Sequence, residues 1–339
     1  MKSKVRQAFS IQRRQYLTAL SASVLLPVGL QSPAAMAQSA YPNRPIKLVI
    51  GYTTGGAGDA LARMMAQKYS EVFSQSVLVE NKPGASATIA AAFVAKSPAD
   101  GYTLLINTAP DAVIAPLTMS ANIQYDVQRD FAPVGLIVTV PSVLVVPSGS
   151  PYKTIEDIIK AAKAHPGKLN YGSGGNGTAA NMAAELFKNV ANLDIAHIAF
   201  KGSSPAMVEL LAGRLDFMFD TFASAWPQIQ SGKLRPLGVT TASRVPLAPN
   251  IPTMEEQGFK GCIWQSFIGV TAPAATPPAI LKKLYDDTAK IVAMSDVQKR
   301  IIDMGMIPGK AIGPEYAAFI QAETKQTRDL IRQSNIRFN

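Results

Sequence analysis

Hydrophobic positions along the chain follow two alternating periods. The short runs "PIKLVIGY", "SVLVE" and "YTLLIN" are apolar and β-rich, and the longer segment "GDALARMMAQKYSEVF" lies between the first two. In that segment Leu61, Met65, Tyr69 and Val72 recur at helical spacing, so they face one core. Alternation of this kind predicts parallel strands covered by helices, which is the α/β class.

The later part of the chain repeats this scheme after a change of pattern. Two apolar runs, "VGLIVTV" and "SVLVV", are separated by Pro141, and Thr154 is expected to cap the helix that follows. Further strand–helix pairs lead to "CIWQSFIGVTAP", which is typical of a returning strand, and to three final helices. We therefore expect lobe 1 to be discontinuous, 38–140 plus 264–339, with lobe 2 (141–263) inserted into it.

The first residues are typical of an exported protein. Five basic residues precede the acid-free run "LTALSASVLLPVGL" and the sequence "PAAMA", which ends at Ala37 and has small residues where a signal peptidase requires them. The apolar run spans about 14 residues, fewer than the ~20 that cross a bilayer. We therefore predict a signal peptide at 1–37 and a soluble, exported mature protein. The pair Arg13–Arg14 leaves both the general and the twin-arginine export routes open.

Composition excludes several classes of protein. The formal net charge of +10 falls to +5 without residues 1–37, because 28 basic residues then face 23 acidic ones. These charges are scattered, without the basic runs or interleaved aromatic residues of nucleic-acid binders. Cys262 is the only cysteine, so no internal disulfide forms. About 302 residues exceed the usual size of one core, which again favours two domains.

A glycine-rich stretch, "NYGSGGNGTAANMAAELF", raises the question of a cofactor. Gly172, Gly174 and Gly177 have the G-x-G-x-x-G spacing of a dinucleotide-binding turn. Such a site also needs an acidic residue at the end of the next strand, to hold the ribose. Asp194 lies at the entrance of that strand, and Lys201 follows its end. We therefore expect no dinucleotide.

A second glycine loop, "YTTGGAGDALAR", also joins a strand to a helix, in the other lobe. Leu61 occupies the position of the third glycine of a dinucleotide turn, so this loop also fails the motif. Both loops place backbone N–H groups at a helix N-terminus, where the unpaired donors and the helix dipole favour an anion. Asp59 is expected to organise its loop. Two such termini facing each other would hold a carboxylate.

Groups suited to catalysis are scarce. His165 lies at a helix end and His197 inside an alternating strand, so both are interpreted as structural. The sequence "SPYK" matches the S-x-x-K of penicillin-recognising serine enzymes but lacks their companion motifs. We therefore expect neither an enzyme nor a bound cofactor.

Five segments carry a resemblance to a known family: "YPNRPIKLVIGYTTGGAGDALAR", "VENKPGASATIAAAFVAKSPADGYTLLINT", "LNYGSGGNGT", "AFKGSSPAMVELLAGRLDFMFD" and "SGKLRPLGVTTASRVPLAPNIPTMEEQGF". They resemble the tripartite tricarboxylate transporter receptors, the Bug-type periplasmic solute-binding proteins. The resemblance implies a type II periplasmic-binding-protein fold, in which two lobes with central, mostly parallel sheets are joined by a two-segment hinge. It also implies a small organic carboxylate or dicarboxylate as ligand, and membrane transporter subunits as partners.

The resemblance and the two loops together give the expected ligand-binding residues. Two departures from the family pattern, at Thr53–Thr54 and at Asn181, bear on the choice of ligand. The expected residues are Tyr52, Thr53, Thr54, Gly55, Gly56, Asp59, Gly84, Ala85, Ser86, Thr108, Ser173, Gly174, Asn176, Gly177, Thr178, Lys201, Gly202 and Asp220.

The leading hypothesis is a monomeric periplasmic receptor that closes around a carboxylate and delivers it to a transporter. Two alternatives remain open from the residues alone. One is a twin-arginine-exported, dinucleotide-dependent oxidoreductase, and the other is a carboxylate sensor for a two-component system.

Overall fold

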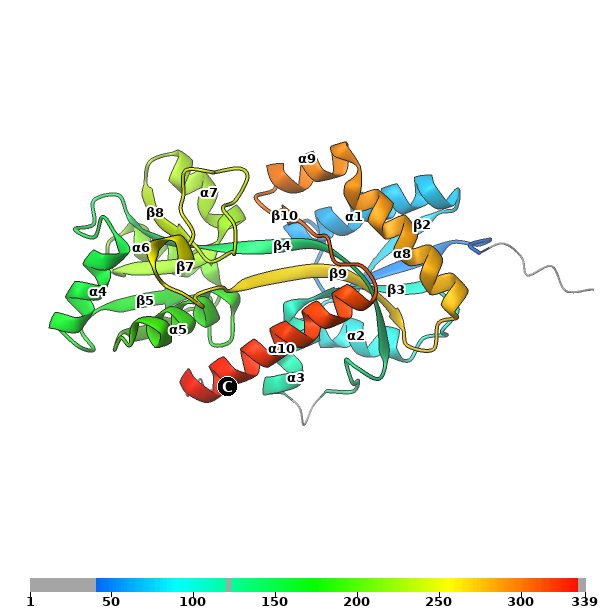
Figure 1. The fold of residues 1–339 in the computed structure, drawn as a ribbon, viewed down its shortest axis with the longest axis horizontal. Helices are drawn as coiled ribbons and strands as arrows, with labels where there is room; N and C mark the ends of the chain where they lie inside the picture. The colour runs from blue at the N-terminus through cyan, green and yellow to red at the C-terminus, as the bar shows by residue number, and fades with distance from the viewer. Residues whose placement is uncertain (1–40, 120–122, 335–339) are drawn as a thin grey trace, which may run out of the picture. The chain divides into compact units, whose positions relative to one another are not determined.

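The computed structural model describes residues 41–119 and 123–334, which belong to one compact unit (Figure 1). The signal peptide expected at 1–37, its cleavage site and the Arg13–Arg14 pair lie outside the described residues. None of the described helices is both long and apolar enough to span a lipid bilayer.

The strands form one mixed sheet, parallel toward both edges and antiparallel in the middle. Its order is β2-β1-β3-β9-β4-β7-β5-β6, and β8 and β10 also pair with β4. β1 is parallel to β2 and β3, and β5 is parallel to β6 and β7, whereas β4 and β9 run antiparallel to their neighbours. The strands are β1 (Ile46–Ile50), β2 (Val77–Asn81), β3 (Thr103–Thr108), β4 (Phe131–Pro147), β5 (Asn170–Ser173), β6 (Ala196–Ala199), β7 (Phe217–Thr221), β8 (Leu234–Val239), β9 (Gln265–Pro273) and β10 (Ile307–Pro308).

Helices cover both faces of this sheet, which confirms the α/β class. Leu61, Met65 and Tyr69 are buried in the core against β1 and β3, and Val72 packs at its edge, as their spacing predicts. The helices are α1 (Ala57–Phe73), α2 (Thr88–Ala95), α3 (Ala115–Thr118), α4 (Ile155–Ala164), α5 (Ala179–Ala191), α6 (Ser203–Leu211), α7 (Phe222–Gln230), α8 (Pro278–Ala293), α9 (Ser295–Asp303) and α10 (Pro314–Ser334), with the short turns η1 (Ala85–Ala87), η2 (Pro110–Ile114) and η4 (Glu255–Gln257).

Local sequence signals explain where α4 begins. The Thr154 Oγ1 accepts the Asp157 N–H at 3.2 Å, and the Asp157 Oδ2 accepts the Thr154 N–H at 2.9 Å. This reciprocal pair is a capping box, which satisfies two backbone donors that the helix itself leaves unpaired. The cap expected at Thr154 is therefore confirmed.

β4 and β9 run side by side through the middle of the sheet (Figure 1). β4 pairs with β9 as far as Pro141, opposite Gln265, and from Ser142 onward it pairs with β7 and β8. Although the sequence separates two apolar runs at Pro141, the strand continues through it. A proline removes one ladder bond because it lacks an N–H, and Pro141 lies where β4 exchanges one partner strand for others. The lobe boundaries expected from the sequence stay a prediction.

The register brings the carboxyl ends of the parallel strands toward each other. Thr108 ends β3 and pairs with Ile268, which in turn pairs with Val138 of β4. Thr221 ends β7 and pairs with Ser142 of β4. β3 runs in the direction of β4 and β7 runs against it, so the two ends point at each other across four residues of β4. At ~3.3 Å per residue, this separation along β4 is about 13 Å.

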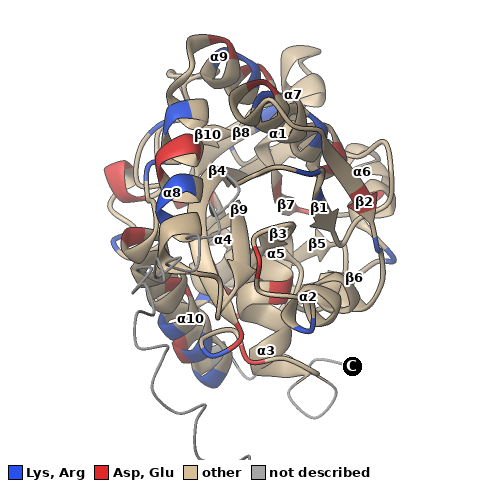
Figure 2. Cartoon of the chain, turned by 90° about the vertical axis from the view of Figure 1, so that its right-hand side faces the viewer, with Lys and Arg blue, Asp and Glu red and all other residues tan. Residues whose placement is uncertain are grey.

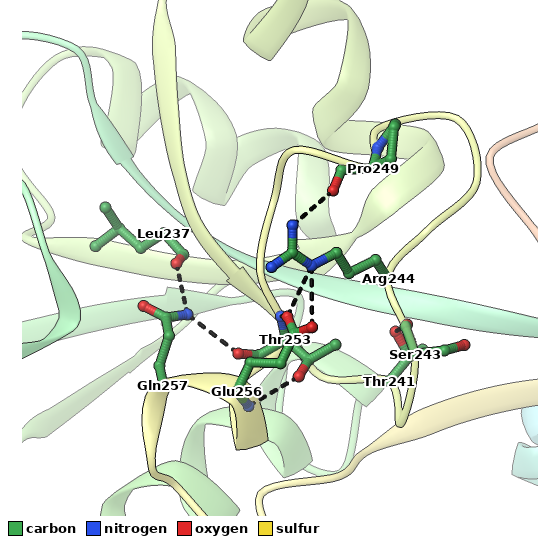
Figure 3. A network of polar contacts seen from close by, with 8 residues as sticks. All are labelled: Leu237, Thr241, Ser243, Arg244, Pro249, Thr253, Glu256 and Gln257. Carbon is green, nitrogen blue, oxygen red and sulfur yellow. Dashed lines mark hydrogen bonds and ion pairs between the residues drawn. The ribbon is translucent and has the colours of Figure 1, made fainter.

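A polar network anchors the segment that leads from β8 back to β9 (Figure 3). The Arg244 Nε donates to both carboxylate oxygens of Glu256, at 2.8 and 3.0 Å, and its Nη1 donates to the Pro249 carbonyl at 2.9 Å. The Gln257 side chain donates to the Leu237 carbonyl at 3.0 Å. Further on, the Thr240 carbonyl accepts the Trp264 N–H at 2.9 Å. The second connection between the two halves of the sheet is thus tied to β8.

The terminal helix α10 contacts both halves of the sheet. Ile320 packs with Phe267 of β9, whereas Leu330 belongs to the core cluster that contains Phe187 of α5. The Gln326 Nε2 donates to the Ile263 carbonyl at 2.5 Å. α10 therefore spans the region in which β4 changes partners.

Charges of both signs alternate along the outer helices (Figure 2). On α8, Lys282 pairs with Asp286 and Lys283 with Asp287, each four residues apart. Exposed pairs at this spacing contribute only about 0.3–0.5 kcal/mol each. Their importance here is that the positive charges are interspersed with negative ones, which agrees with the absence of basic runs from the sequence.

Replacing Gly269 by alanine should destabilise the central strands. A Cβ at Gly269 would run into the ring of Tyr316 and lie 2.7 Å from the Gly135 carbonyl oxygen. Overpacking of this kind costs about 1–3 kcal/mol. We expect urea denaturation of Gly269→Ala to give a free energy of unfolding lower by that amount. The control is Gly149→Ala, because a Cβ there has no neighbour within 4 Å; equal stability of the two variants would contradict this account.

Candidate functional site

The loop after β1 is held in shape by Asp59. The Asp59 Oδ2 accepts the Gly55 N–H at 3.0 Å, and its Oδ1 accepts a hydrogen bond from the Asn81 amide at 2.9 Å. The same Asn81 amide donates to the Tyr52 carbonyl at 2.9 Å. The Arg63 guanidinium, 2.9 Å away, together with Asn81 and the Gly55 N–H, lowers the pKa of Asp59 to about 2. Asp59 is therefore ionised and organises the loop.

This arrangement leaves backbone donors at the start of α1 exposed. Thr53, Thr54, Gly55 and Gly56 are exposed, and Gly56 precedes the helix without a side-chain cap. The first N–H groups of a helix have no partner within it. A Cβ at Gly56 would have nothing within 4 Å, so the space beside this helix end is open. The loop expected to receive an anion is thus accessible.

The loop after β2 has an unusual backbone. Ala85, Ser86 and Ala87 have φ values of 46, 54 and 69°, in the left-handed region that residues with a Cβ rarely adopt. A Cβ at Gly51, at the end of β1, would clash with Ala87, so these two loops pack closely. Each left-handed residue costs about 1–3 kcal/mol, and such strain clusters at binding sites. Gly84, Ala85 and Ser86 are exposed.

Thr108, at the end of β3, is tied to a buried carboxyl group that the sequence did not single out. Asp111, in η2, accepts the Thr108 N–H at 2.8 Å and its Oγ1–H at 2.5 Å. Because the Thr108 hydroxyl donates to Asp111, it accepts from the Tyr52 hydroxyl, 3.3 Å away. Burial raises the pKa of Asp111 to about 7. A hydrogen-bonded chain thus connects Tyr52, Thr108 and Asp111. No pattern in the sequence indicated Asp111, because a single aspartate after Pro110 matches no motif.

The glycine loop after β5 rests on a buried polar network. The Asn181 Oδ1 accepts the Gly177 N–H at 2.9 Å, which makes the Asn181 Nδ2 a donor. The Nδ2 donates to the Tyr171 hydroxyl at 2.8 Å and lies 3.4 Å from the His197 Nδ1. The Tyr171 hydroxyl in turn donates to Glu185 at 2.6 Å. Asn181, which departs from the family pattern, therefore links the loop to the core.

This network fixes the tautomer of His197. Because the His197 Nδ1 faces the Asn181 donor, the ring proton is on Nε2, which donates to the Ser173 Oγ at 2.7 Å. The Ser173 hydroxyl also accepts the Gly175 N–H and donates to the Gly175 carbonyl, both at 3.1 Å. Ser173 is fully buried. It therefore lies beneath the glycine loop with its hydrogen bonds already made, and the structural interpretation of His197 agrees with these contacts.

Gly174 and Gly177 serve the shape of this loop. A Cβ at Gly174 would lie 2.9 Å from the Ser203 nitrogen and 3.0 Å from the Gly202 carbonyl carbon. The Gly202 N–H donates to the Gly174 carbonyl at 3.1 Å, and Gly177 has a φ of 73°. The absent side chain at Gly174 therefore permits contact between two loops. The sequence could not distinguish this role from admission of a ligand.

The remaining expected residues lie around the same edge. Asn176 and Lys201 are exposed, and the Thr178 hydroxyl donates to the Gly175 carbonyl at 2.8 Å. Asp220, one residue before the end of β7, is buried, and its Oδ1 accepts the Thr221 N–H at 2.8 Å. Its Oδ2 makes no hydrogen bond of good geometry among the described residues. Burial raises the pKa of Asp220, and the nearby Ser203 and Ser224 hydroxyls act in the opposite direction.

All the expected ligand-binding residues therefore lie at or near the two sets of strand ends that face each other across β4. One set follows β1, β2 and β3, and the other follows β5, β6 and β7. The chemistry offered is that of hydrogen-bond donors, namely backbone N–H groups, hydroxyls and one exposed lysine. Within 41–119 and 123–334, no three His, Cys, Asp or Glu side chains gather closely enough to hold a metal ion.

The half-buried imidazole of His197 should make stability depend on pH. Burial lowers the pKa of His197, so between that value and ~6.5, the pKa of a free histidine, the unfolded chain binds more protons than the folded chain. The free energy of unfolding should therefore fall as pH drops below ~6.5. We expect His197→Gln to remove this contribution in urea denaturation measured between about pH 5 and 8.

The comparison of variant with wild type isolates the imidazole. Burial raises the pKa of Asp111 and of Glu323 to about 7, so these two groups make the free energy of unfolding rise as pH drops. This effect is the same in wild type and in His197→Gln, and it cancels in the comparison. His165→Gln, at the exposed end of α4, is the matched control. If the difference in free energy of unfolding between His197→Gln and wild type does not vary with pH, the lowered pKa assigned to His197 is wrong.

The sequence and fold are similar to those of known solute-binding proteins. Residues 61–336 match the tripartite tricarboxylate transporter family receptor. The UPF0065 protein of the tcbD–tcbE intergenic region in a Pseudomonas species is 36% identical over 99% of both chains. Protein BugT of Bordetella pertussis is 29% identical over 94% of this chain and 97% of its own.

Solved structures agree with this relationship. R. palustris Rpa4515 with adipate has a TM-score of 0.75 and 33% identity, covering 88% of this chain and 99% of that one. The periplasmic binding protein BugD has a TM-score of 0.70 and 30% identity over 88% and 99%. MatC from Rhodopseudomonas palustris with bound malate has a TM-score of 0.70 and 27% identity over 86% and 100%. The expected periplasmic-binding-protein fold is thereby confirmed, and the chain belongs to the family of tripartite tricarboxylate transporter receptors.

Proposed function

We propose that this protein is a periplasmic receptor that captures a small organic carboxylate or dicarboxylate and delivers it to the membrane subunits of a tripartite tricarboxylate transporter. The observation that carries the proposal is the register of β4, which directs two sets of loops at each other. Family membership favours a receptor over a dinucleotide-dependent oxidoreductase. The proposed receptor acts without catalysis and without a cofactor.

The ligand class follows from the donors at the two edges. The N-termini of α1 and α5 follow β1 and β5, so the positive ends of both helix dipoles lie at the two edges. The start of α1 also offers exposed N–H groups, whereas several N–H groups of the α5 loop are already bonded. Each such terminus stabilises an anion by about 0.3–1 kcal/mol when exposed and by up to ~2 kcal/mol when partly buried. Related receptors have been solved with adipate and with malate, both dicarboxylates. A linear diacid would place one carboxylate at each edge.

The two loops take different parts in binding. At the α1 edge, Thr53, Thr54 and Gly56 offer exposed hydroxyl and N–H donors. At the α5 edge, Asn176 is exposed, and Lys201 adds a positive charge. Ser173 acts from beneath the loop as a positioning residue. The Asp220 carboxyl group, beside the Ser203 and Ser224 hydroxyls, is a further acceptor for a hydroxyl group on the ligand or for a bound water.

Hinge bending would bring these halves together. Lobe 1, 38–140 plus 264–339, and lobe 2, 141–263, are connected by β4 and by the segment that enters β9. A ligand that contacts both edges binds the closed arrangement more tightly than the open one, so it shifts the population toward closure. The closed monomer is then the form that the transporter recognises.

Gly56→Val should abolish carboxylate binding without loss of stability. The valine side chain would occupy the open space beside the first N–H groups of α1, and no neighbouring atom lies within 4 Å of its Cβ. We expect affinity for the best ligand of a panel that contains malate, adipate and succinate to fall by about 100-fold, measured by isothermal titration calorimetry. Gly149→Val, also in open space, is the control.

The same panel tests the proposal as a whole. Ligand at about 100 times its Kd adds about 2.7 kcal/mol to the free energy of unfolding, which raises the melting temperature measurably. If no carboxylate shifts the melting temperature at millimolar concentration, the protein is not a receptor of this class. If binding occurs but Gly56→Val matches wild type, the proposed site is wrong while the function stands.

A further inference from the structure

A cavity lies beside η2, outside the loops that carry the expected ligand-binding residues. It has a volume of about 330 Å³ and opens to solvent between α3, the segment 123–133 and α10. Its apolar walls include Leu117, Tyr125, Phe131 and Ile320. None of the expected ligand-binding residues lines it. Cavities from about 300 Å³ upward, mostly apolar with a few polar groups, are typical of small-molecule sites.

A small recess next to this cavity contains an unsatisfied polar group. The recess, about 10 Å³ in volume, shares Tyr125, Phe131 and Ile320 with the cavity and is lined further by Thr271 of β9. Thr271 is 97% buried, and its Oγ1 has no hydrogen-bond partner among the described residues. A buried hydroxyl without a partner is costly, so a water or a ligand atom in the recess would stabilise it.

The rim of the cavity carries a positive charge that is available to a ligand. Arg328, on the exposed side of α10, lines the cavity, and no ion pair involves it in the described part of the chain. The adjacent Asp329 pairs instead with Lys325 at 2.9 Å. A guanidinium offers paired N–H donors that match a carboxylate. Asp126 also lines the cavity, and its negative charge disfavours a ligand that carries more than one carboxylate.

We propose that this cavity binds an amphipathic monocarboxylate, with its hydrocarbon or aromatic body between α10 and the 123–133 segment and its carboxylate paired with Arg328. This is a different class from the diacids proposed for the main site, because the described lining combines one cationic side chain, Arg328, with an extended apolar surface. The wall also includes Asp111, in the recess, which hydrogen-bonds to Thr108 of the main site. The test therefore uses substitutions at other positions.

Octanoate and its neutral counterpart octanamide are suitable probes for titration calorimetry on the purified protein. Octanoate should bind wild type more tightly than octanamide does. Arg328→Gln should weaken octanoate binding by about tenfold and remove the preference for the acid, because the charge-assisted hydrogen bonds are lost. Arg332→Gln removes the same charge one turn along α10, outside the cavity, and should change affinity by less than about twofold.

A cavity-filling variant gives an independent measurement. Ala317→Phe, from the half-exposed wall of α10, should eliminate octanoate binding and preserve the melting temperature. Gly56→Val should retain octanoate binding, which separates this cavity from the main site. No binding of octanoate at millimolar concentration, equal effects of Arg328→Gln and Arg332→Gln, or loss of octanoate binding in Gly56→Val would each overturn the proposal.

Discussion

The arrangement of the whole molecule depends on continuous hydrogen bonding along β4. Its first part pairs with β9 and its last part with β7 and β8, so one strand belongs to both halves of the sheet. Because strand direction is fixed by these pairings, β3 and β7 must point their carboxyl ends at the same short stretch, Val138 to Ser142. The loops proposed to bind the ligand follow those ends. Their position is therefore a consequence of register.

The two glycine loops satisfy their backbone groups to different degrees. Around Gly174 and Gly177 the N–H groups of several residues already bond to Ser173, to Asn181 or to one another. Around Gly56 the charged Asp59 fixes the loop from one side, and the helix N-terminus remains exposed. A loop with satisfied donors is stiff, and a loop with free donors attracts a ligand. Similar glycine patterns thus have different physical roles.

Periodicity predicted most of the fold because burial follows spacing, as Leu61, Met65 and Tyr69 illustrate. Periodicity could not show that β4 continues through Pro141. A proline signals the loss of one ladder hydrogen bond, and a strand can either end or continue at such a position. The position of Asp111 beneath Thr108 depends on the turn that η2 makes, which no side-chain pattern encodes. The glycine patterns and the family resemblance together indicated the loops, and only coordinates distinguish a buried Ser173 from exposed donors.

This difference between the loops bears on how a receptor selects its ligand. A stiff edge, organised around Asn181 and His197, presents a fixed set of donors and tolerates little variation in the group that it meets. The α1 edge can adapt, because Thr53 and Thr54 are exposed and add rotatable hydroxyls. In the receptor proposed above, the distance that β4 sets between the edges would measure ligand length. Changes at Thr53 and Thr54 would then alter specificity without disturbing the core.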